Sequence, residues 1–359
     1  MRLTAACIGF SAALLALQAV PAGAAPPSLE GKTVRVIVPY AAGGAVDVVA
    51  RLLASHVGKH LSGRPTIIVE NMPGAGGARG ANYLYNVAPK DGTAFGVTIP
   101  PFTVEFIGRK GVRFESAKFN WIGSFNISQV TFVHKSLAVK SARDLLNSGK
   151  ELVIGGLRPN SARDLRMRAF LEALGIKNYK YVSGYGGTAA VRQAILRGEV
   201  NFSDEAAAAI VTSLRSPLED GTIVPFVQTG LTRDGKRVPD PRLADVPLAE
   251  ETVVALRGEA VRSSVEYRAM RAVIGMVALG RAIILPPGVD TDAVSAWRDA
   301  IAKLNSDADF QRHAAKQSGG VEMILTSGAE SQALAREVSE LVTKDPQALS
   351  YLEKLAKGK

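Results

Sequence analysis

The stretch TVRVIVPYAAGG, residues 33–44, decides the fold class. A run of β-branched residues ends at Pro39, and a turn that contains Gly43 and Gly44 follows it. Apolar residues then recur at helical spacing from Ala45 to His60. This succession predicts a strand, a glycine turn and a helix, which together begin an α/β unit.

The same order recurs immediately downstream. The run TIIVEN (66–71) predicts a second strand, the turn MPGAGG (72–77) leads to a helix around residues 78–88, and residues 94–98 predict a third strand. Continuous apolar strands that alternate with helices indicate a parallel sheet with helices on both faces.

A second α/β series begins at residue 152. We expect strands at 152–156, 179–183, 199–202 and 223–228, and helices at 161–174, 188–197 and 206–214. Residues 234–247 predict a long surface connection, the apolar segment 274–285 returns to the first domain, and a helix at 292–304 and further C-terminal helices complete that domain. We therefore expect two lobes with a cleft between them, residues 26–125 and 274–359 forming lobe 1 and residues 126–273 forming lobe 2.

Length and composition are those of a folded two-domain protein. The chain has 359 residues, of which 47% are hydrophobic and 21% are charged, so each domain can bury its own core. The formal charge of +10 comes from scattered basic residues without a Lys/Arg run. This distribution disfavours nucleic acid as a partner and suits a small anionic ligand.

The N-terminus predicts a cleavable signal peptide over residues 1–25. Met1-Arg2 is positively charged, Ile8 to Val20 is apolar but too short to span a bilayer, and Ala22-Gly23-Ala24 fits a cleavage site. The single cysteine, Cys7, would be removed with it. The mature, exported chain would then have neither disulfides nor a thiol nucleophile.

Catalytic and cofactor motifs fail on their spacing. Arg79 stands where the third glycine of a dinucleotide-binding G-x-G-x-x-G would fall, and no P-loop pattern occurs. His56 and His60 are four residues apart but lack the glutamate of H-E-x-x-H, so we interpret them as exposed residues at a helix end. No G-x-S-x-G elbow is present. We expect no cofactor, no metal and no catalytic residues.

The two glycine turns are candidate carboxylate cradles. Glycines let the backbone approach a ligand, and the helix N-terminus that follows directs N–H groups towards it. Plain turns that only need a positive φ are the alternative, but two such turns at equivalent positions favour binding. Asp47, in the first turn of its helix, either caps free N–H groups or meets the ligand.

The turn after strand 152–156 is the candidate site in the second lobe. It contains Arg158, Asn160, Ser161 and Arg163, and arginine suits bidentate contacts with a carboxylate. A solvated basic loop is the alternative. If Arg158 meets the far end of the ligand, the site favours a second carboxylate.

The chain resembles a known family of receptors. VIVPYAAGG (36–44) with Asp47 and Arg51, VENMPGAGG (69–77) and PKDG (89–92) are similar to the substrate-binding receptors of tripartite tricarboxylate transporters, also called Bug receptors. YGG (185–187), DVP (245–247) and LPPGV (285–289) extend this resemblance over nearly the whole mature chain.

The resemblance implies a two-lobed periplasmic binding protein of the type II-like α/β class, with a ligand cleft between the lobes. Such a monomeric receptor closes on a small organic carboxylate and delivers it to the membrane permease subunits. The ligand-binding residues that we predict here are Tyr40, Ala41, Gly43, Gly44, Asp47, Gly74, Ala75, Gly76, Gly77, Arg158, Asn160, Ser161, Gly187, Thr188 and Asp204.

Several departures from the family pattern affect the ligand. Met72 replaces the usual Arg, Ala42 the usual Pro, and Arg158-Pro159-Asn160 a turn of small residues, and the paired Trp before the Pro-x-Gly segment is missing. The alternative functions are an exported enzyme that acts on an acidic substrate and a ligand sensor that feeds a signalling system.

Overall fold

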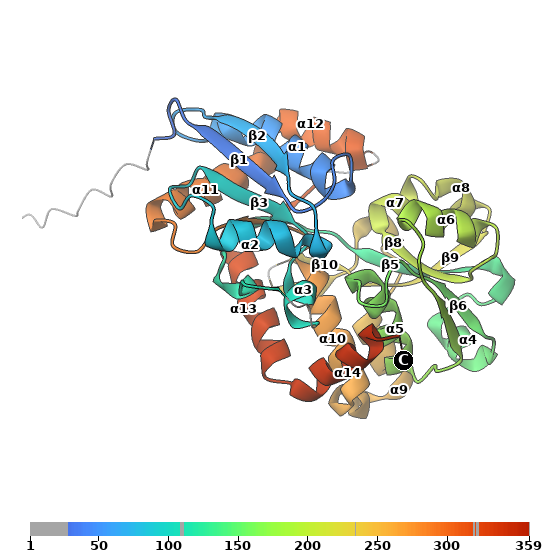
Figure 1. Cartoon of the computed structure of the whole chain (residues 1–359). Coiled ribbons are helices and arrows are strands. Elements are labelled where there is room, and N and C mark those ends of the chain that lie inside the picture. The colour runs from blue at the N-terminus through green and yellow to red at the C-terminus, as the bar shows by residue number, and fades with distance from the viewer. Residues whose placement is uncertain (1–27, 108–110, 234, 319, 321–322, 359) are drawn as a thin grey trace, which may run out of the picture.

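The computed structural model describes residues 28–107, 111–233, 235–318, 320 and 323–358. The predicted signal peptide over residues 1–25 lies outside these ranges. The described chain forms two α/β lobes, each built around its own sheet (Figure 1). None of its helices is long and apolar enough to cross a membrane.

The first lobe has a six-stranded sheet in the order β13-β4-β12-β3-β1-β2. Its strands are β1 (Thr33–Val38), β2 (Thr66–Asn71), β3 (Ala94–Thr98), β4 (Asn120–Phe125), β12 (Arg281–Leu285) and β13 (Leu325–Ser327). The helices of this lobe are α1 (Ala45–Val57), α2 (Ala78–Asn86), α3 (Phe102–Phe106), α11 (Thr291–Lys303), α12 (Ala308–Ser318) and α13 (Gly328–Thr343).

The second lobe has a five-stranded sheet in the order β7-β6-β8-β5-β9. Its strands are β5 (Gln129–His134), β6 (Leu152–Gly155), β7 (Tyr179–Val182), β8 (Phe202–Ala206) and β9 (Ile223–Gln228), and a hairpin of β10 (Leu231–Arg233) and β11 (Lys236–Val238) follows. Its helices are α4 (Ala142–Ser148), α5 (Ala162–Leu174), α6 (Thr188–Leu196), α7 (Ala207–Val211), α8 (Arg215–Glu219) and α9 (Ala249–Arg257).

The parallel pairing that the strand-helix alternation predicts is found in part of each sheet, and the remaining strands are antiparallel. β1 pairs in parallel with β2 and β3, as expected, but β12 is antiparallel to both β3 and β4. The physical reason is the chain path: β4 leads out to the second lobe and β12 leads back from it, so these neighbours run in opposite directions. In the second lobe β5 is likewise antiparallel to β8 and β9.

The strand predicted at 199–202 lies further along the chain, as β8 (Phe202–Ala206). β8 carries the buried polar residues Ser203, Asp204 and Glu205, which an apolar pattern does not predict. Burial is tolerated because both carboxylates have arginine partners, Asp204 with Arg166 and Glu205 with Arg192.

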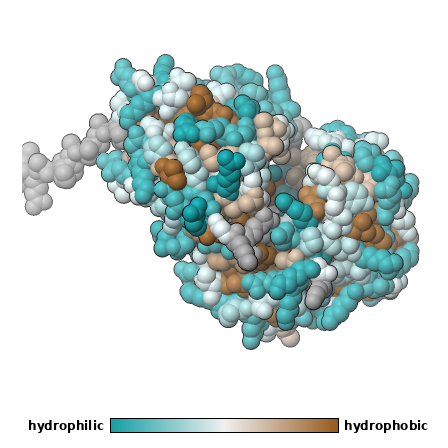
Figure 2. Space-filling view, viewed as in Figure 1, coloured by the Kyte–Doolittle hydropathy of each residue, from teal (hydrophilic) through white to brown (hydrophobic). Residues whose placement is uncertain are grey.

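Two helices join the lobes on one side of the molecule. α10 (Val265–Ala278) packs against α5 of the second lobe and against α13 and α14 (Pro346–Ala356), and α14 also contacts α5 (Figure 1). A single hydrophobic core therefore runs from Ile37 and Leu84 in the first lobe to Leu165 and Phe170 in α5. The other side of the molecule is hollowed between the lobes (Figure 2).

Candidate ligand-binding site

A hollow of about 270 Å³ lies between the lobes and brings several predicted site residues together. We call it the loop hollow. Its wall in the first lobe includes Tyr40 and Gly76, one from each glycine turn, and its wall in the second lobe includes Arg158, Asn160, Ser161 and Thr188. Residues more than a hundred positions apart thus line one cavity, as a cleft between two lobes requires.

The charge of the loop hollow is one-sided. Four arginines line it, Arg158, Arg163, Arg166 and Arg281, and no Asp or Glu is among its described lining residues. A concave surface with one sign of charge concentrates ions of the opposite sign. The loop hollow is therefore electrostatically suited to an anion.

The first glycine turn is held in place by Asp47. Asp47 Oδ2 accepts hydrogen bonds from the Gly43 backbone N–H and from Arg51 Nε, both at 2.9 Å, and Oδ1 accepts one from Asn71 Nδ2 at 2.9 Å. Asn71 Nδ2 also donates to the Tyr40 carbonyl at 3.0 Å. Asp47 is only 1% exposed, and of the two expected roles the structure shows the binding of a free N–H group, that of Gly43 in the turn.

The backbone of the first turn is partly satisfied from within the protein. The Gly43 N–H donates to Asp47, and the Gly44 N–H points to the Ala41 carbonyl at 3.4 Å. Neither Ala41 nor Gly44 lines the loop hollow, and Gly43 lines a second hollow described below. Fewer backbone N–H groups at this turn are therefore open to a ligand than the sequence predicts.

The second glycine turn has a backbone that favours glycine throughout. Gly74, Ala75, Gly76 and Gly77 all have positive φ, at 140°, 47°, 64° and 104°. A Cβ on Gly77 would lie 2.9 Å from Tyr40 Oη, which is closer than side chains pack. The turn thus coils against Tyr40 and places Gly76 in the wall of the loop hollow, while Gly74, Ala75 and Gly77 support it from outside the lining.

The turn before α5 is held by Asp164. Its Oδ2 accepts hydrogen bonds from the backbone N–H groups of Leu157 at 2.7 Å and Arg158 at 2.8 Å, and from Tyr181 Oη at 2.9 Å. Burial and the neighbouring Asp164 carboxylate raise the pKa of Tyr181. Ser161 caps the helix N-terminus through the Asp164 N–H. The Arg158 side chain is exposed at the edge of the loop hollow.

Asp204 lies behind the loop hollow and not in its wall. Its carboxylate, 1% exposed, accepts hydrogen bonds from Arg166 Nη2 at 2.5 Å and Arg166 Nε at 3.1 Å. The Arg163 side chain donates hydrogen bonds to the backbone carbonyls of Asp204 and Gly155, at 3.1 and 2.9 Å, and so links the start of α5 to β8 and β6. Gly187 is the N-cap of α6, next to Thr188 in the wall.

Arg281 is one of the lining residues that the sequence did not predict. It is the first residue of β12, and its Nη1 donates to the Gly280 carbonyl at 3.2 Å. Within the described residues it has no carboxylate partner, and burial lowers its pKa. One signal was available: Arg281 is the single charged residue between Ala272 and Val289.

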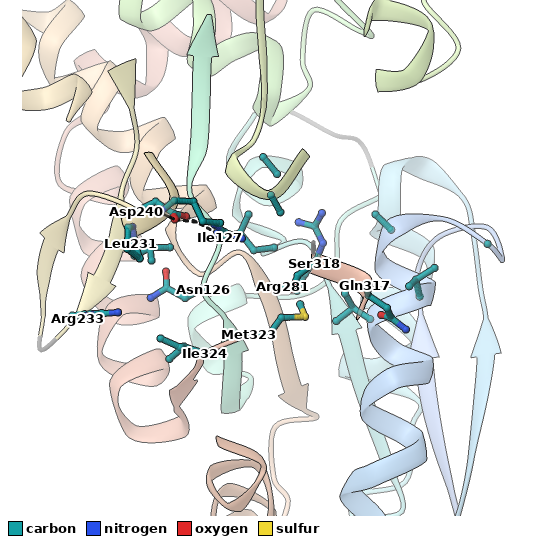
Figure 3. Close-up of a pocket in the computed structure, with 18 residues that line it drawn as sticks. Asn126, Ile127, Leu231, Arg233, Asp240, Arg281, Gln317, Ser318, Met323 and Ile324 are labelled. Carbon is teal, nitrogen blue, oxygen red and sulfur yellow. Dashed lines mark hydrogen bonds and ion pairs between the residues drawn. The ribbon is translucent and has the colours of Figure 1, made fainter. Parts of the chain in front are cut away.

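A second hollow of about 350 Å³ shares Arg281 with the loop hollow. We call it the apolar hollow, because Val48, Val49, Ile127, Leu231, Met323 and Ile324 line much of it. Figure 3 shows these walls, with Met323 and Gln317 on the side of Arg281 and Leu231 and Asp240 across from them. The Asp240 carboxylate pairs with Arg242 at 2.5 Å, so this acid is neutralised.

The two histidines of α1 and its extension have separate partners. His56 Nε2 lies 3.2 Å from His313 Nδ1, and His60 Nε2 lies 2.8 Å from Asp307 Oδ2. His60 is therefore a packed contact to the start of α12 and not the exposed residue that we expected. Among the described residues no group of three His, Cys, Asp or Glu could hold a metal ion.

We predict that the Asp47 brace depends on pH. Its hydrogen bond to Arg51, with those from Gly43 and Asn71, lowers the pKa of Asp47 from 3.8 to about 2. A depressed pKa stabilises the fold above the unfolded-state pKa, and this contribution is lost as the pH falls from about 4 to about 2. Asp47→Asn should lower the free energy of unfolding by about 1–2 kcal/mol at pH 7.

Urea unfolding of the wild type and Asp47→Asn at several pH values tests this prediction. The difference between the two proteins should shrink steadily below pH ~4. Glu340→Gln is the matched control, since Glu340 forms an exposed pair with Lys344 and should change stability by less than about 0.5 kcal/mol. A difference for Asp47→Asn that is independent of pH would contradict the brace.

Comparison with known proteins places the fold. No protein-family model matches the chain. The UPF0065 protein in the gbd 5'region of Cupriavidus necator is 34% identical over 114 residues, and the UPF0065 protein in the TAR-I ttuE-ttuC' intergenic region of Agrobacterium vitis is 31% identical over 177 residues. These matches span 32% and 50% of the relatives and 32% and 47% of this chain.

Solved structures match nearly the whole chain. The periplasmic binding protein BugD is 22% identical with a TM-score of 0.59, covering 90% of this chain and 97% of its own. MatC of Rhodopseudomonas palustris, solved with malate, is 19% identical with a TM-score of 0.58, covering 90% and 98%. Rpa4515 of the same organism, solved with adipate, is 19% identical with a TM-score of 0.61, covering 90% and 97%. The two-lobed fold and the resemblance to Bug receptors are thereby confirmed.

Proposed function

We propose that this chain is a periplasmic receptor that captures a small organic carboxylate between its lobes and delivers it to the permease of a tripartite tricarboxylate-type transporter. The observation that carries the proposal is the loop hollow, whose walls come from both lobes. Four arginines line it, and its described lining residues include no Asp or Glu. BugD is a periplasmic binding protein, and MatC and Rpa4515 were solved with malate and adipate, which supports capture without turnover.

Hinge closure is the mechanism that we infer. The chain passes between the sheets at residues 126–128, after β4, and at residues 279–280, before β12. Rotation about such short connections brings the walls of a cleft together and excludes water from the ligand. The receptor would act as a monomer, because each lobe supplies half of the site within one chain.

The carboxylates bound by the neighbours provide the first probes. MatC was solved with malate and Rpa4515 with adipate, and both acids are small enough for the cleft proposed here. Thermal unfolding of the protein without residues 1–25 should be measured with mono-, di- and tricarboxylates. A ligand at 100 times its Kd should add about 2.7 kcal/mol to the free energy of unfolding.

Two outcomes of these measurements would overturn the proposal. One is a complete panel of carboxylates without any stabilisation, and the other is consumption of the bound acid on prolonged incubation, which would indicate an enzyme. Small-angle scattering adds a separate test, since a tightly bound acid should reduce the radius of gyration as the lobes close.

Arg158 provides a prediction about the far end of the ligand. Because its guanidinium is exposed at the edge of the loop hollow, Arg158→Ala should weaken adipate binding by about 0.5–1 kcal/mol and reduce its salt dependence. Adipate monoamide should be affected less, since it lacks the second charge. Calorimetric titration of both ligands checks this, and equal losses would show that Arg158 does not read a distal carboxylate.

A further inference from the structure

We propose that the ligand is a carboxylate with an apolar body, whose anionic head binds Arg281 and whose aromatic or medium-chain aliphatic body lies in the apolar hollow. This inference rests on the proposed function and adds a ligand class to it. It is carried by Arg281, by the residues that line the apolar hollow, and by the position of Arg281 between the two hollows.

Arg281 is a partly buried cation of the cleft that has no carboxylate partner among the described residues. The other arginines deep in the cleft have acids within the protein: Arg163 pairs with Asp164 at 2.9 Å, and Arg166 pairs with Asp204. Within the described ranges Arg281 has only the Gly280 carbonyl as a hydrogen-bond partner. A partly buried guanidinium without a carboxylate is costly, and a ligand carboxylate would supply what is missing through a bidentate contact.

The apolar hollow is lined by side chains that gain from contact with a hydrocarbon. Of the five large hydrophobic side chains that are exposed in the described chain, two face this hollow: Val48 at 39% exposed and Ile324 at 45% exposed. Val49, Leu231 and Met323 extend the same surface. Exposed apolar side chains gathered around one cavity are typical of a ligand-binding surface.

Charge in the apolar hollow does not favour a second anionic group deep within it. Its acid, Asp240, is fully buried and hydrogen-bonded twice by Arg242, while Arg233 is exposed to solvent. A hydroxylated acid such as malate would place polar groups against Val48 and Ile324, whose hydrocarbon side chains form no hydrogen bonds. An apolar body buries these carbons without leaving a polar group unsatisfied.

Calorimetric titration with 3-phenylpropionate, 3-phenylpropanamide and malate tests the inference. We expect the wild type to bind 3-phenylpropionate at least ~tenfold more tightly than either the amide or malate. Arg281→Gln should weaken binding of the acid at least ~tenfold and bring it close to that of the amide. Arg281→Lys keeps the charge but cannot form the bidentate contact of a guanidinium, so it should retain part of the affinity.

The apolar hollow is tested by Val48→Asn, which should weaken 3-phenylpropionate binding about fivefold or more. The matched control is Val87→Asn, because Val87 is 67% exposed at the end of α2 and lines neither hollow. Its affinity should equal that of the wild type. If Arg281→Gln fails to fold, the comparison of acid with amide on the wild type still decides whether a charge is read.

Each result has a defined consequence. Tighter binding of malate than of 3-phenylpropionate would overturn the inference and leave the proposed function standing. The same follows if 3-phenylpropionate binds but neither Arg281→Gln nor Val48→Asn changes its affinity. Absence of binding by every carboxylate tested would overturn the inference and the proposed function together.

Discussion

Replacing Asp204 by alanine is expected to lower the free energy of unfolding by about 3–5 kcal/mol. Asp204 and Arg166 form a buried pair, with side chains 1% and 5% exposed and atoms 2.5 Å apart. Removing the carboxylate leaves the largely buried Arg166 guanidinium without a counter-charge among the described residues, with only the weak contact to Gln129 Oε1 at 3.4 Å. The cost is that of a buried charge without a counter-charge.

A double variant separates this cause from loss of packing. Arg166→Met combined with Asp204→Ala removes both charges and should recover a large part of the stability, because replacing a whole buried pair is often close to neutral. Glu205→Ala is the matched control on the same strand, since its partner Arg192 is more exposed. Urea unfolding curves measure all four proteins, and a loss below about 1 kcal/mol for Asp204→Ala would contradict the assignment.

The pair also bears on the prediction of Asp204 as a ligand-binding residue. Asp204 was predicted among the ligand-binding residues, but its carboxylate is bound to Arg166 and does not line the loop hollow. Its partner is 38 residues earlier in the chain, on α5. Pairing across such a separation leaves no local pattern, because it depends on how β8 and α5 pack.

Strands and turns that are marked by a local sequence pattern lie where they were predicted. The strands β2 (Thr66–Asn71), β3 (Ala94–Thr98) and β9 (Ile223–Gln228) have the expected bounds, because runs of apolar residues bounded by turns mark them directly. The glycine turns also lie between strand and helix as expected. The antiparallel strands of both sheets were not predicted, since their direction depends on where the chain crosses between the lobes and not on any single segment.

In the candidate site, too, residues in locally marked turns were predicted, and residues whose role depends on three-dimensional contacts were not. The turns of Gly76 and Ser161 predict that both residues lie near the ligand, and both line the loop hollow. Arg281 was not predicted, although it interrupts an apolar segment, because its role depends on the lack of a carboxylate partner in three dimensions. Side-chain partners decide which polar residues are free for a ligand, and a single sequence does not give those partners.

The two connections between the lobes approach each other closely at Gly280, directly before Arg281. Gly280 has a φ of 53°, and its N–H donates to the Val277 carbonyl at 3.0 Å. A Cβ at this position would lie 1.9 Å from the Phe125 carbonyl oxygen and 3.0 Å from the Ile127 backbone nitrogen. The backbones of the outgoing and returning chains therefore approach each other closely here, and a side chain at this position would collide with the Phe125 carbonyl.

Gly280→Ala should accordingly destabilise the protein by about 2–4 kcal/mol, through left-handed strain of about 1 kcal/mol and overpacking of about 1–3 kcal/mol. Gly149→Ala is the matched control, because Gly149 has a φ of 60° and no atom lies within 4 Å of the position that its Cβ would take, so it meets the strain alone. Thermal and urea unfolding of both variants measure the difference that the clash contributes.

Since the clash would push Phe125 away from β12, Gly280→Ala should also displace Arg281 and weaken carboxylate binding, whereas Gly149→Ala should bind as the wild type does. Equal destabilisation by the two substitutions would show that the connections can separate freely at this point, and the close crossing would then not constrain the hinge.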